Sequence, residues 1–556
     1  MSQQTEFDAI VVGAGFGGIY QLYSLLKLGL SVRAIDAASD VGGTWYWNRY
    51  PGAMSDTNSF IYRYSWDKED LLEYPWPEHY VKQPEVLKYL QHVVEKHDLR
   101  KYFLFNTEMR SADFDEDKNV WKIKTKDGTI YTARYVVTAL GLLSKRNFPD
   151  YPGVHSFKGE MHHTGAFPRE YDFRNKRVGV IGSGSTGVQV ITALGKPGQV
   201  KQLTSFQRSP QYSVPSGDGP VSKEEREKFN QGYKDGSVYD QVFNSLVAFG
   251  FDESTIPTFS VSEEERQRIY QENWDKGNGF RFMFGTFCDI TYDRAANDAA
   301  CNFIKSKIKE TVKDPEKARK LLPDEPYARR PLCDGGYYQT FNNDHVDVVH
   351  LKETPITEFN ENGIRTSDGK QHDLDVIILA TGFDAMDANY MRVSIKGRNR
   401  ESLQDHWDKK NGPSTYIGMA VPDFPNWFMI TGPMGAFANL PPVIDTQVEW
   451  ITDAIKAQME RDNEKSVGAG GTAEGKKTIE ASQAAEDGWL EGCYKLAAGT
   501  LFTEANSWIF GTNIPGKRYA KALTFFFGGL KTYRQIIDKE AQDGYPGFEN
   551  RAPLAA

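Results

Sequence analysis

The sequence has few cysteines, and they show no pairing pattern. The 556 residues include four cysteines, with no C-x-x-C pair and no spacing typical of metal ligands: Cys288, Cys301, Cys333 and Cys493. This pattern gives no sign of a disulfide scaffold or of dithiol redox chemistry, and we predict no metal site. We expect buried or inert thiols in a reducing compartment.

Long apolar runs, targeting signals and an excess of positive charge are also missing. No apolar run approaches the roughly 20 residues that a membrane helix needs. The start M-S-Q-Q-T-E-F-D has neither the basic nor the apolar region of a signal peptide. The net charge of -9 argues against nucleic acid or an anionic membrane surface as a partner. We therefore expect a cytoplasmic protein without either partner, and we expect it to be a monomer.

The clearest positive signal is a dinucleotide-binding motif near the N-terminus. A β-rich run at 7–12 leads into G-A-G-F-G-G, and helix-like apolar spacing follows at 19–28. The spacing G-x-G-x-x-G allows a tight turn, close approach of a pyrophosphate and packing of helix on strand, and it is made by Gly13, Gly15 and Gly18. A predicted strand at 31–35 ends in Asp36, whose carboxylate suits ribose hydroxyls and leaves no room for a 2′-phosphate. The motif predicts an FAD or NAD site; an ordinary glycine-rich turn is the alternative.

The same motif occurs a second time with one difference. The run 177–181 enters G-S-G-S-T-G, with its glycines at Gly182, Gly184 and Gly187. The next predicted strand, 200–206, is followed by Arg208 where the first motif has an acid. A guanidinium there can clamp a phosphate bidentately, so this site is predicted to bind NADP(H); a surface ion pair is the alternative role of Arg208. Further candidate contacts from this turn and helix are Ser183, Ser185, Thr186 and Gln189.

Two later β-branched runs, 135–141 and 375–382, each close on a glycine. Such runs suit points where a chain crosses between two nucleotide-binding domains, although a buried strand before a glycine turn has the same letters. A chain of 556 residues is also too long for a single core. We predict an α/β fold with two Rossmann-like dinucleotide-binding domains, for FAD and NADP, and a helical insertion. The expected segments are 1–145 (FAD-binding domain, first part), 146–220 (NADP-binding domain, first part), 221–327 (helical insertion), 328–380 (NADP-binding domain, second part) and 381–556 (FAD-binding domain, second part, with substrate-cavity loops).

The predicted insertion is charged and helical, and it contains one aromatic cluster. The cluster G-N-G-F-R-F-M-F-G-T-F spans 277–287 and could form either core or the wall of a pocket. Its flanking glycines favour the pocket wall. Farther on, the low-complexity stretch from Ser466 to Gly475 predicts an exposed surface loop.

Two longer motifs connect the chain to a known family. The stretch V-G-G-T-W-Y-W-N-R-Y-P-G-A-M-S-D at 41–56 matches every fixed position of a fingerprint of the type I Baeyer-Villiger monooxygenases: Gly42, Gly43, Trp45, Tyr50, Pro51, Gly52 and Asp56. Their other fingerprint, F-x-G-x-x-x-H-x-x-x-W followed by Pro or Asp, corresponds here to Phe157, Gly159, His163, Phe167 and Pro168. Phe167 stands where Trp is usual, which preserves an aromatic ring but removes the indole N–H.

The resemblance spans nearly the whole chain, and the chain looks most like the cyclohexanone monooxygenases. Motifs that carry it include W-Y-W-N-R-Y-P-G, Y-A-R-R-P-L-C-D and N-S-W-I-F-G-T-N-I-P-G-K. It implies that NADPH reduces FAD, that O2 adds to the flavin C4a carbon, and that this C4a-peroxyflavin attacks a ketone. One oxygen atom is then inserted beside the carbonyl to give a lactone or ester and water. A cyclic ketone is the expected substrate.

The resemblance also implies site residues. Arg330 matches the active-site arginine, whose charge would stabilise the peroxide and the tetrahedral adduct, and Asp56 would hold it by a charge-assisted pair. Without the resemblance, a turn-capping Asp and a solvated Arg are the simpler interpretations. Arg329 and Trp508 match NADP contacts, although Trp508 could be a core residue. His163 is expected in a linker that couples domain movement to the two half-reactions rather than in direct catalysis.

The remaining candidates fall into two sets. The FAD contacts implied are Gly13, Gly15, Phe16, Gly18, Asp36, Gly43, Thr44, Trp45, Trp47, Asp56 and Tyr62. The substrate cavity implied is Leu142, Leu143, Phe249, Phe280, Phe282, Phe437, Ala438, Leu440 and Phe527. Relatives usually carry Thr at the position of Ala438, so the cavity is expected to be slightly larger and less polar there.

Two other functions share the paired glycine motifs. The first is oxygenation at nitrogen or sulfur by a related flavin monooxygenase, which is not expected to combine the 41–56 pattern with the Arg330 segment. The second is a non-oxygenase redox protein using NADPH and FAD, in which NADPH oxidation would be indifferent to ketones.

Overall fold

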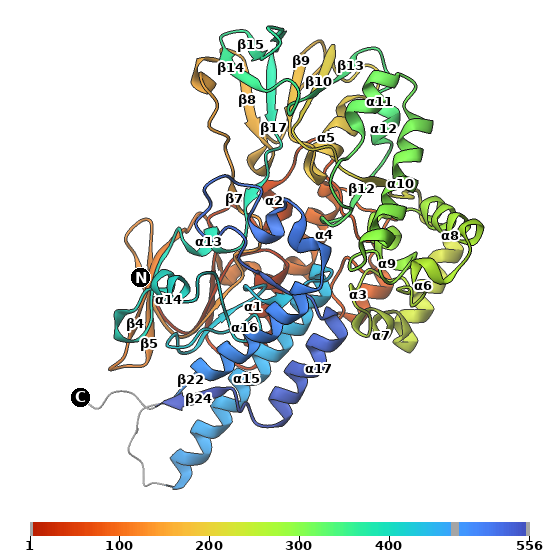
Figure 1. Ribbon diagram of the computed structural model, residues 1–556. Coiled ribbons are helices and arrows are strands. Elements are labelled where there is room, and N and C mark those ends of the chain that lie inside the picture. Colours follow the sequence, from red (N-terminus) through yellow and green to blue (C-terminus); the bar gives the residue numbers. More distant parts are fainter. Residues whose placement is uncertain (1–3, 469–476, 552–556) are drawn as a thin grey trace.

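The protein is represented by a computed structural model that describes residues 4–468 and 477–551 (Figure 1). Its elements form two lobes, one above the other in this view, with a group of helices on the right. The lower lobe is built on an eight-stranded sheet and the upper lobe on a five-stranded sheet.

The sheet of the lower lobe takes strands from distant parts of the chain. These are β1 Glu6–Val12, β2 Val32–Ile35, β3 Phe103–Leu104, β4 Met109–Asp115, β5 Val120–Thr125, β6 Ile130–Thr138, β19 Ser394–Lys396 and β20 Trp427–Met429. Their order is β19-β4-β5-β6-β1-β2-β3, and β20 also pairs with β6. Strand β1 runs parallel to β2 and β6, whereas β4, β5 and β6 form an antiparallel meander. The first predicted motif therefore lies at the centre of this sheet.

The upper lobe is built only from the middle of the chain. Its strands are β8 Glu160–His163, β9 Arg177–Ile181, β10 Gln202–Gln207, β13 Val346–His350 and β17 Val376–Leu379. Their order is β13-β10-β9-β17-β8, and every pair is parallel. All four residues of β17 are buried, as is typical of a parallel strand covered on both faces. A small antiparallel sheet of β14 Ile356–Asn360, β15 Gly363–Thr366 and β16 Gln371–Asp373 lies at the top (Figure 1).

The two glycine motifs form the same turn in the two lobes. Gly13 has φ +120° and Gly182 has φ +112°, a region that favours glycine. A Cβ on Gly13 would lie 2.4 Å from the Ala139 carbonyl oxygen, and a Cβ on Gly182 would lie 2.3 Å from the Ala380 carbonyl oxygen. The first turn therefore packs closely against the end of β6, and the second against the end of β17; these are the neighbouring strands in the two sheets. Helices α1 Phe16–Lys27 and α5 Ser185–Leu194 follow these turns.

The chain passes between the lobes twice, and the two crossings lie side by side. Strand β7 Lys145–Arg146 carries the chain upward after β6, and β18 Phe383–Asp384 carries it back after β17. The two short strands pair antiparallel, and β7 lies between the lobes in Figure 1. The predicted β-branched runs, 135–141 and 375–382, extend past the ends of β6 at Thr138 and β17 at Leu379. The crossing strands follow these runs: β7 begins at Lys145 and β18 at Phe383.

The stretch predicted as a helical insertion is helical and lies on the right of Figure 1. It contains α6 Lys223–Asp235, α7 Ser237–Phe243, α8 Glu263–Lys276, α9 Gly279–Gly285, α10 Arg294–Thr311 and α11 Pro315–Leu321. Side-chain oxygens of Ser222, Ser262 and Asn278 cap three of these helices. The insertion begins after β11 Ser213–Pro215 and ends before β12 Leu332–Asp334, which pair with each other.

The C-terminal helices support the lower lobe from below. Helix α15 Leu440–Gly468 packs against α1 and against α17 Gly529–Gln542, and α16 Gln483–Ala498 lies beside them. The last strand, β24 Phe548–Arg551, pairs with β22 Thr478–Ala481. The predicted surface loop from Ser466 to Gly475 begins inside α15; the rest of that prediction, 469–475, lies outside the described residues.

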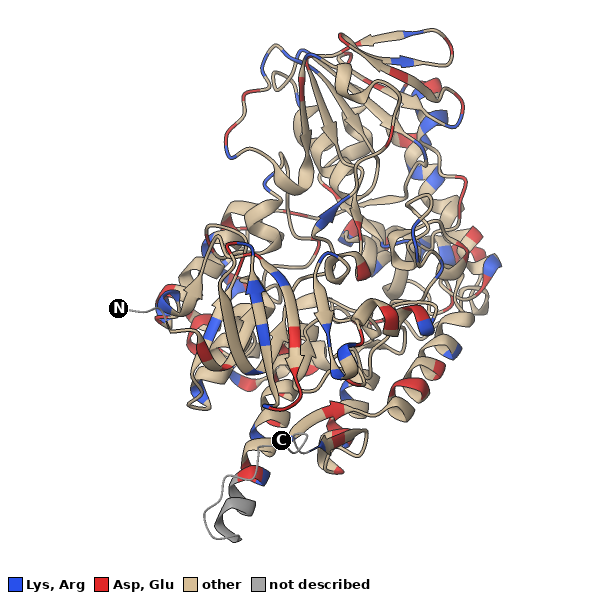
Figure 2. Ribbon diagram, turned by 90° about the vertical axis from the view of Figure 1, so that its left-hand side faces the viewer, with Lys and Arg blue, Asp and Glu red and all other residues tan. Residues whose placement is uncertain are grey.

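Acidic and basic residues are interspersed along the ribbon in Figure 2. Within residues 4–468 and 477–551, no helix is both long and apolar enough to cross a membrane.

Candidate active site

The predicted contact between Asp56 and Arg330 is present. Nη1 of Arg330 lies 2.6 Å from Oδ2 of Asp56; the Asp56 side chain is 3% exposed and that of Arg330 31% exposed. The guanidinium carbon lies 5.3 Å from the ring centroid of Phe280. Burial lowers the pKa of Arg330, but the Asp56 carboxylate more than offsets this and leaves the pKa above its ordinary value. The site therefore holds a permanent positive charge against an aromatic wall.

Helix α5 of the upper lobe reaches this pair. Nε2 of Gln189 donates to Oδ1 of Asp56 at 3.4 Å, and Oγ of Ser185 donates to Oδ2 at 3.5 Å. Both donors follow the second glycine turn, so they contribute upper-lobe hydrogen bonds to a lower-lobe carboxylate. Asp56 is therefore bonded both to Arg330 and to two residues of the upper lobe.

Gln189, which is predicted to contact a phosphate or ribose, also makes hydrogen bonds to the 50–56 segment. Its Oε1 accepts from the Tyr50 hydroxyl at 2.9 Å, and its Nε2 also donates to the Met54 carbonyl at 3.1 Å. Burial raises the pKa of Tyr50 to about 12, which keeps this phenol protonated as a donor. The amide thus joins α5 to the 50–56 segment, and its contact with a phosphate or ribose stays a prediction. Ser183 likewise donates to the protein, to the Ser209 carbonyl at 2.8 Å.

Asn278 connects the Asp56 backbone to the aromatic wall, and the sequence interpretation missed it. Its Nδ2 donates to the Asp56 carbonyl at 2.9 Å, and its Oδ1 accepts from the backbone N–H of Phe280 at 2.9 Å. The same side chain therefore caps α9 and fixes Phe280 beside Arg330. Its position between two glycines in the sequence was the available signal, because Asn caps helices and tolerates the left-handed backbone region, where the structure places it with φ +78°.

The first glycine turn meets a second one from the 41–56 stretch. A Cβ on Gly43 would lie 2.8 Å from the Gly15 Cα atom, so two side-chain-free turns touch. Helices α1 and α2 Thr44–Trp47 both begin at these glycines without a side-chain cap, and uncapped helical N–H groups attract phosphates. Asp36 accepts from the backbone N–H of Ala14 and of Ala38 at 2.7 Å each. The residues fit a dinucleotide with a pyrophosphate at the paired turns.

Aromatic side chains line the region beside this turn. Nε1 of Trp45 donates to the Tyr62 hydroxyl at 3.1 Å, and Phe16 lies edge-on to Tyr62 with centroids 5.4 Å apart. Burial raises the pKa of Tyr62. Thr44 and Trp47, on the same short helix α2, are exposed. Phe16, Trp45 and Tyr62 therefore pack together beside the first glycine turn.

The second glycine turn is more open than the first. A Cβ on Gly184 would meet no atom within 4 Å, which leaves room for a pyrophosphate to approach, and Thr186 is half-buried in the first turn of α5. A Cβ on Gly187 would lie 2.1 Å from the Gly182 carbonyl oxygen, so that glycine packs helix on turn. Arg208 is exposed and has no ion pair with any described residue, so nothing in this structure supports its alternative role as an ion-pair partner. The residues fit NADP(H).

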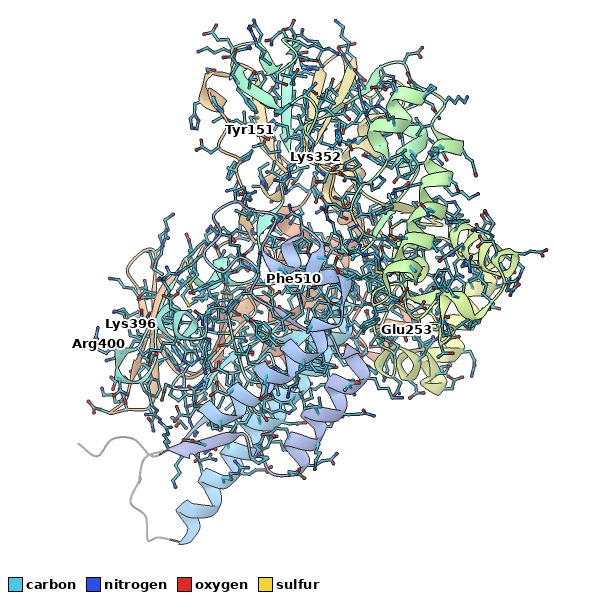
Figure 3. All side chains as sticks on the ribbon, in the orientation of Figure 1. Tyr151, Glu253, Lys352, Lys396, Arg400 and Phe510 are labelled. Atoms are coloured by element: carbon cyan, nitrogen blue, oxygen red, sulfur yellow. The ribbon has the colours of Figure 1, made fainter. Side chains whose placement is uncertain are left out.

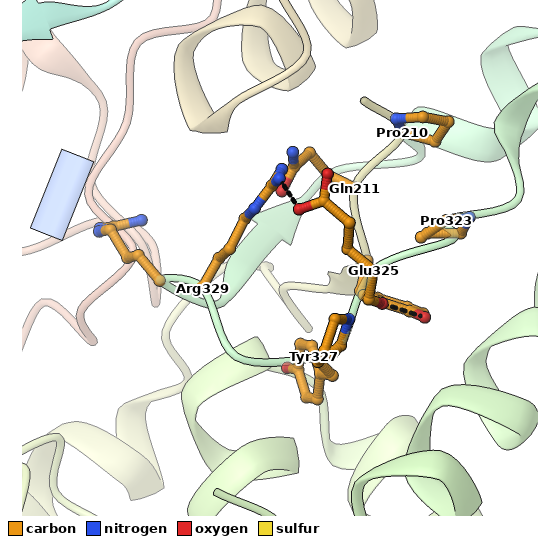
Figure 4. A pocket seen from close by; sticks show the side chains of 9 residues that line it. Pro210, Gln211, Pro323, Glu325, Tyr327 and Arg329 are labelled. Atoms are coloured by element: carbon orange, nitrogen blue, oxygen red, sulfur yellow. Dashed lines mark hydrogen bonds and ion pairs between the residues drawn. The ribbon is translucent and has the colours of Figure 1, made fainter. Parts of the chain in front are cut away.

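Arg329 makes an ion pair with Glu325, drawn as a dashed line in Figure 4. Burial lowers the pKa of Arg329, Glu325 raises it, and Arg208 lowers it again, with a net decrease. The cavity of about 10 Å³ beside this pair is large enough for about one water molecule. Arg329, which is predicted to contact a phosphate, therefore already has a carboxylate partner in this structure.

The loop that carries Trp508 makes ion pairs with β18 and with the residues just after it. Trp508 is half-buried and lies edge-on to Phe525, with ring centroids 5.9 Å apart. Nζ of Lys517 lies 2.9 Å from Asp384 and 2.8 Å from Asp387. In Figure 3, Phe510 of this loop lies between the lobes. Lys517 was not singled out from the sequence because its partners are more than 100 residues away.

Two aromatic pairs account for most of the predicted cavity. The rings of Phe249 and Phe280 stack with centroids 3.8 Å apart, and those of Phe437 and Phe527 lie 5.1 Å apart. Asn439 joins the two pairs: its backbone N–H donates to the Val247 carbonyl at 2.9 Å, and its Oδ1 accepts from Thr57 at 3.0 Å. The remaining predicted members range from buried to exposed: Leu142, Leu143, Ala438 and Leu440.

The prediction that Phe282 lines the cavity is wrong. Phe282 is fully buried, and its ring packs against Tyr270 and Phe303 with centroids 5.5 and 5.7 Å away. It belongs to the core of the insertion. The aromatic cluster therefore divides: Phe280 faces Arg330, whereas Phe282, two residues later on α9, faces the opposite way.

The second fingerprint lies at the crossings. Nδ1 of His163 accepts from the backbone N–H of Gly165 at 3.0 Å, and its ring contacts Phe148 and Phe383 with centroids 5.0 and 5.7 Å away. Burial and then Arg146 lower the pKa of His163 to about 4, so the imidazole is neutral near pH 7. Within this fingerprint a Cβ on Gly159 would contact the Phe157 ring, Phe167 is buried, and Pro168 is half-buried.

The cysteines are free, with Cys288 exposed and Cys301, Cys333 and Cys493 buried. Among the described residues, no group of three or more His, Cys, Asp or Glu side chains is arranged to hold a metal ion.

Comparisons with known proteins show close relatives over nearly the whole chain. The family model of flavin-binding monooxygenase-like proteins matches residues 8–209. The chain is 50% identical to cyclohexanone 1,2-monooxygenase of Acinetobacter sp, covering 99% of this chain and 97% of that protein. It is 49% identical to a Baeyer-Villiger monooxygenase of Pseudooceanicola batsensis, covering 97% and 95%. It is also 48% identical to phenazine N-monooxygenase PhzNO1 of Lysobacter antibioticus, covering 98% and 97%.

Solved structures show the same likeness. Cyclohexanone monooxygenase from Rhodococcus sp. Phi1 bound to NADP+ is 51% identical, with a TM-score of 0.94 over 99% of this chain and 100% of that one. A closed structure of cyclohexanone monooxygenase gives a TM-score of 0.93 and an open one 0.89, each over 99% of this chain and 100% of that one, at 50% and 48% identity.

Proposed function

The chain belongs to the Baeyer-Villiger monooxygenases, and from that premise we propose that its preferred substrate is a small cyclic ketone, which it converts to a lactone. The overall reaction joins ketone, O2, NADPH and a proton to give lactone, water and NADP+. The observation that carries the proposal is the Asp56–Arg330 pair, in which Asp56 is buried and Arg330 half-buried; it lies against Phe280 and receives hydrogen bonds from the helix of the second glycine turn.

We assign FAD to the lower lobe and NADPH to the upper lobe. Asp36 supports the first assignment because a carboxylate after the second strand suits ribose hydroxyls, and Arg208 supports the second because a guanidinium there suits a 2′-phosphate. The FAD-binding domain would then be 1–145 with 381–556, and the NADP-binding domain 146–220 with 328–380, interrupted by the insertion at 221–327. The crossings at β7 and β18 support these boundaries.

FAD, when bound and reduced by NADPH, supplies the activated oxygen atom. The paired turns at Gly15 and Gly43 would hold its pyrophosphate, and Trp45 and Tyr62 would cover the flavin side and exclude water. On the NADPH side, the open turn at Gly184 would hold the pyrophosphate, Arg208 the 2′-phosphate, and Trp508 the nicotinamide end.

Arg330 supplies a fixed positive charge to the ketone. Negative charge grows on the ketone oxygen as its carbonyl carbon is attacked, and a preorganised donor aimed at such charge is worth roughly 10²- to 10³-fold in rate. Asp56 orients the guanidinium by their 2.6 Å contact, and Phe280 keeps water from one side of it.

The aromatic pairs support a small, apolar ring as substrate. Phe249, Phe280, Phe437 and Phe527 offer ring faces and edges, and few convergent polar groups stand among them apart from Arg330. A pocket of this composition recognises shape more than hydrogen-bonding groups.

We also propose that the protein acts as a monomer in a reducing, cytoplasmic environment. The four free cysteines support the reducing environment.

A second candidate function is oxygenation of a ring nitrogen. It is favoured by the 48% identity to a phenazine N-monooxygenase over nearly the full length of both chains. That relative is almost as similar as the ketone-oxidising ones, so overall identity does not separate the two chemistries.

One experiment tests both candidates. The purified enzyme is given NADPH, air and either cyclohexanone or phenazine, and lactone, N-oxide and hydrogen peroxide are measured per NADPH consumed. Lactone near one per NADPH supports the ketone proposal. N-oxide formation with only peroxide from cyclohexanone would replace it with the second candidate, and peroxide from both substrates would contradict both substrate assignments.

A further inference from the structure

A second cavity lies between the lobes, away from the Asp56–Arg330 pair. Its volume is about 510 Å³, and it is lined by α2, the residues after it, the first half of α4 Gln83–Lys96, and Arg169 of the upper lobe. Arg169 directly follows the second fingerprint. The cavity therefore has walls from both lobes, and neither Arg208 nor Arg329 takes part in it.

Two arginines from different lobes approach the same phenol in this cavity. The guanidinium carbon of Arg49 lies 4.7 Å from the ring centroid of Tyr46. A hydrogen bond with Ser39 lowers the pKa of Tyr46, and the guanidinium groups of Arg169 and Arg49 lower it further. One arginine from each lobe thus lines this cavity, Arg49 from the lower lobe and Arg169 from the upper lobe.

Neither arginine is neutralised by a described carboxylate. No ion pair of Arg49 or Arg169 occurs within residues 4–468 and 477–551, and Nε of Arg49 is buried without a hydrogen-bond partner. The cavity's acid, Asp40, already accepts from Arg100 at 3.0 Å and from Gln91 at 2.9 Å. Its third cation, Lys82, is held by Glu78 and Asp218 at 2.5 Å each.

Two unpaired guanidinium groups brought together repel each other, and an anion between them removes that repulsion. Arginine is the side chain best suited to bidentate contacts with phosphate and carboxylate groups. We propose that this cavity binds a small polyvalent oxyanion, phosphate or a polycarboxylate, between Arg49 and Arg169. The bound anion fastens the upper lobe to the lower lobe.

The cavity is coupled to the active site through one short segment. Tyr50, Gly52 and Ala53 line it, and the same segment packs against α5 on its other side, where a Cβ on Gly52 would lie 2.6 Å from the Gln189 carbonyl oxygen. The segment ends at Asp56. An anion that holds the lobes together also keeps α5 in contact with Asp56.

The test uses holoenzyme saturated with FAD and NADP+, so that the nucleotide phosphate sites are filled. Inorganic phosphate and citrate are titrated separately by calorimetry at constant ionic strength, with sodium chloride as the compensating salt. We expect saturable binding of at least one of the two anions, and binding about tenfold or more weaker in Arg49→Gln and in Arg169→Gln, because each variant loses a charge-assisted contact. Arg174→Gln is the matched control, since Arg174 lies in the same upper-lobe segment but is paired with Asp172.

Two further variants keep the proposal falsifiable if the first pair is unstable. Arg169→Glu places a carboxylate opposite Arg49, so it should raise the thermal unfolding midpoint without added anion and abolish the response to anions. Loss of binding in Arg208→Gln with normal binding in Arg49→Gln would overturn the proposal by placing the anion at the 2′-phosphate position. Binding of neither anion, or an equal response to sodium chloride, would also overturn it.

Discussion

The two glycine turns of this protein share one geometry and differ in what surrounds them. The first turn is closed in: Gly15 touches Gly43, and Asp36 is bonded to two backbone N–H groups. The second is open: a Cβ on Gly184 would meet nothing, and Arg208 is exposed without an ion pair in the described part of the chain. The difference suits one dinucleotide that stays bound, FAD, and one that enters and leaves in each cycle, NADPH.

The largest effect is expected at Arg330, whose partner Asp56 also accepts hydrogen bonds from the helix after the second turn. Arg330→Ala removes the positive charge on which oxygen transfer depends, so lactone formation should fall by at least about 10²- to 10³-fold. Flavin reduction by NADPH should persist, because neither turn is altered. Single-turnover absorbance of the flavin and product analysis measure the two steps separately.

Arg319→Ala is the control for this variant, since Arg319 is an exposed arginine in the insertion that precedes Arg330. Normal lactone formation by Arg330→Ala would remove the assigned role, and loss of flavin reduction would show that Arg330 acts before oxygen transfer.

The contrast between closed and open turns can be tested with one alanine substitution in each turn. Gly13 has φ +120°, and its new Cβ would lie 2.4 Å from the Ala139 carbonyl oxygen, so Gly13→Ala should lose most of its bound FAD. Gly184 has φ -73° and open space around it, so Gly184→Ala should keep FAD and raise the KM for NADPH by about tenfold. Flavin content after desalting and steady-state kinetics give both answers. Equal loss of FAD in the two variants would refute the contrast.

Arg208 makes the sharpest chemical difference between the turns. Arg208→Gln should raise the KM for NADPH by roughly 10- to 100-fold, because a charge-assisted contact to the 2′-phosphate is lost. The KM for NADH should change little, since NADH has no such phosphate. Equal damage with both coenzymes would argue for a structural role.

These glycine turns were predictable from the sequence because they are local. Strand, turn and helix lie within about 20 residues, and the φ values at Gly13 and Gly182 have only one suitable residue type. The fold class followed from finding the motif twice. Strand ends were less exact: β17 stops at Leu379, whereas the β-branched letters continue, because the crossing at β18 takes over.

The residues that join the lobes were not predictable by pattern. Asn278, Asn439 and Lys517 bond to segments 100 to 400 positions away, and no local spacing indicates such partners. Phe282 failed for the same reason, since the aromatic letters do not reveal which side of α9 faces Arg330. The assignment of Arg330 itself depended on resemblance rather than on spacing.

Gln189 offers a smaller test of how the open turn communicates with Asp56. Gln189→Ala removes its contacts with Asp56, Tyr50 and Met54 but leaves the glycine turn intact. We expect hydrogen peroxide per NADPH to rise roughly 2- to 10-fold while the KM for NADPH changes little, as suits the loss of two neutral hydrogen bonds and one long hydrogen bond to a carboxylate. Gln199→Ala, an exposed glutamine just after α5, is the control. A large rise in KM with unchanged peroxide would restore the predicted nucleotide contact.

The smallest effect concerns the crossings between the lobes, where His163 lies. The pKa of His163 is lowered from 6.5 to about 4, so between these values the unfolded chain binds a proton that the folded chain does not. Stability from His163 is therefore complete above about pH 6.5 and is lost as the pH falls toward 4, roughly 2 kcal/mol of it by pH 5. His163→Gln should flatten the fall of the thermal midpoint between pH 7 and pH 5, whereas His155→Gln, at an exposed site, should leave it unchanged. An unaltered slope in His163→Gln would mean that the crossings do not hold a neutral imidazole, and the link between this fingerprint and lobe movement would lose its physical basis.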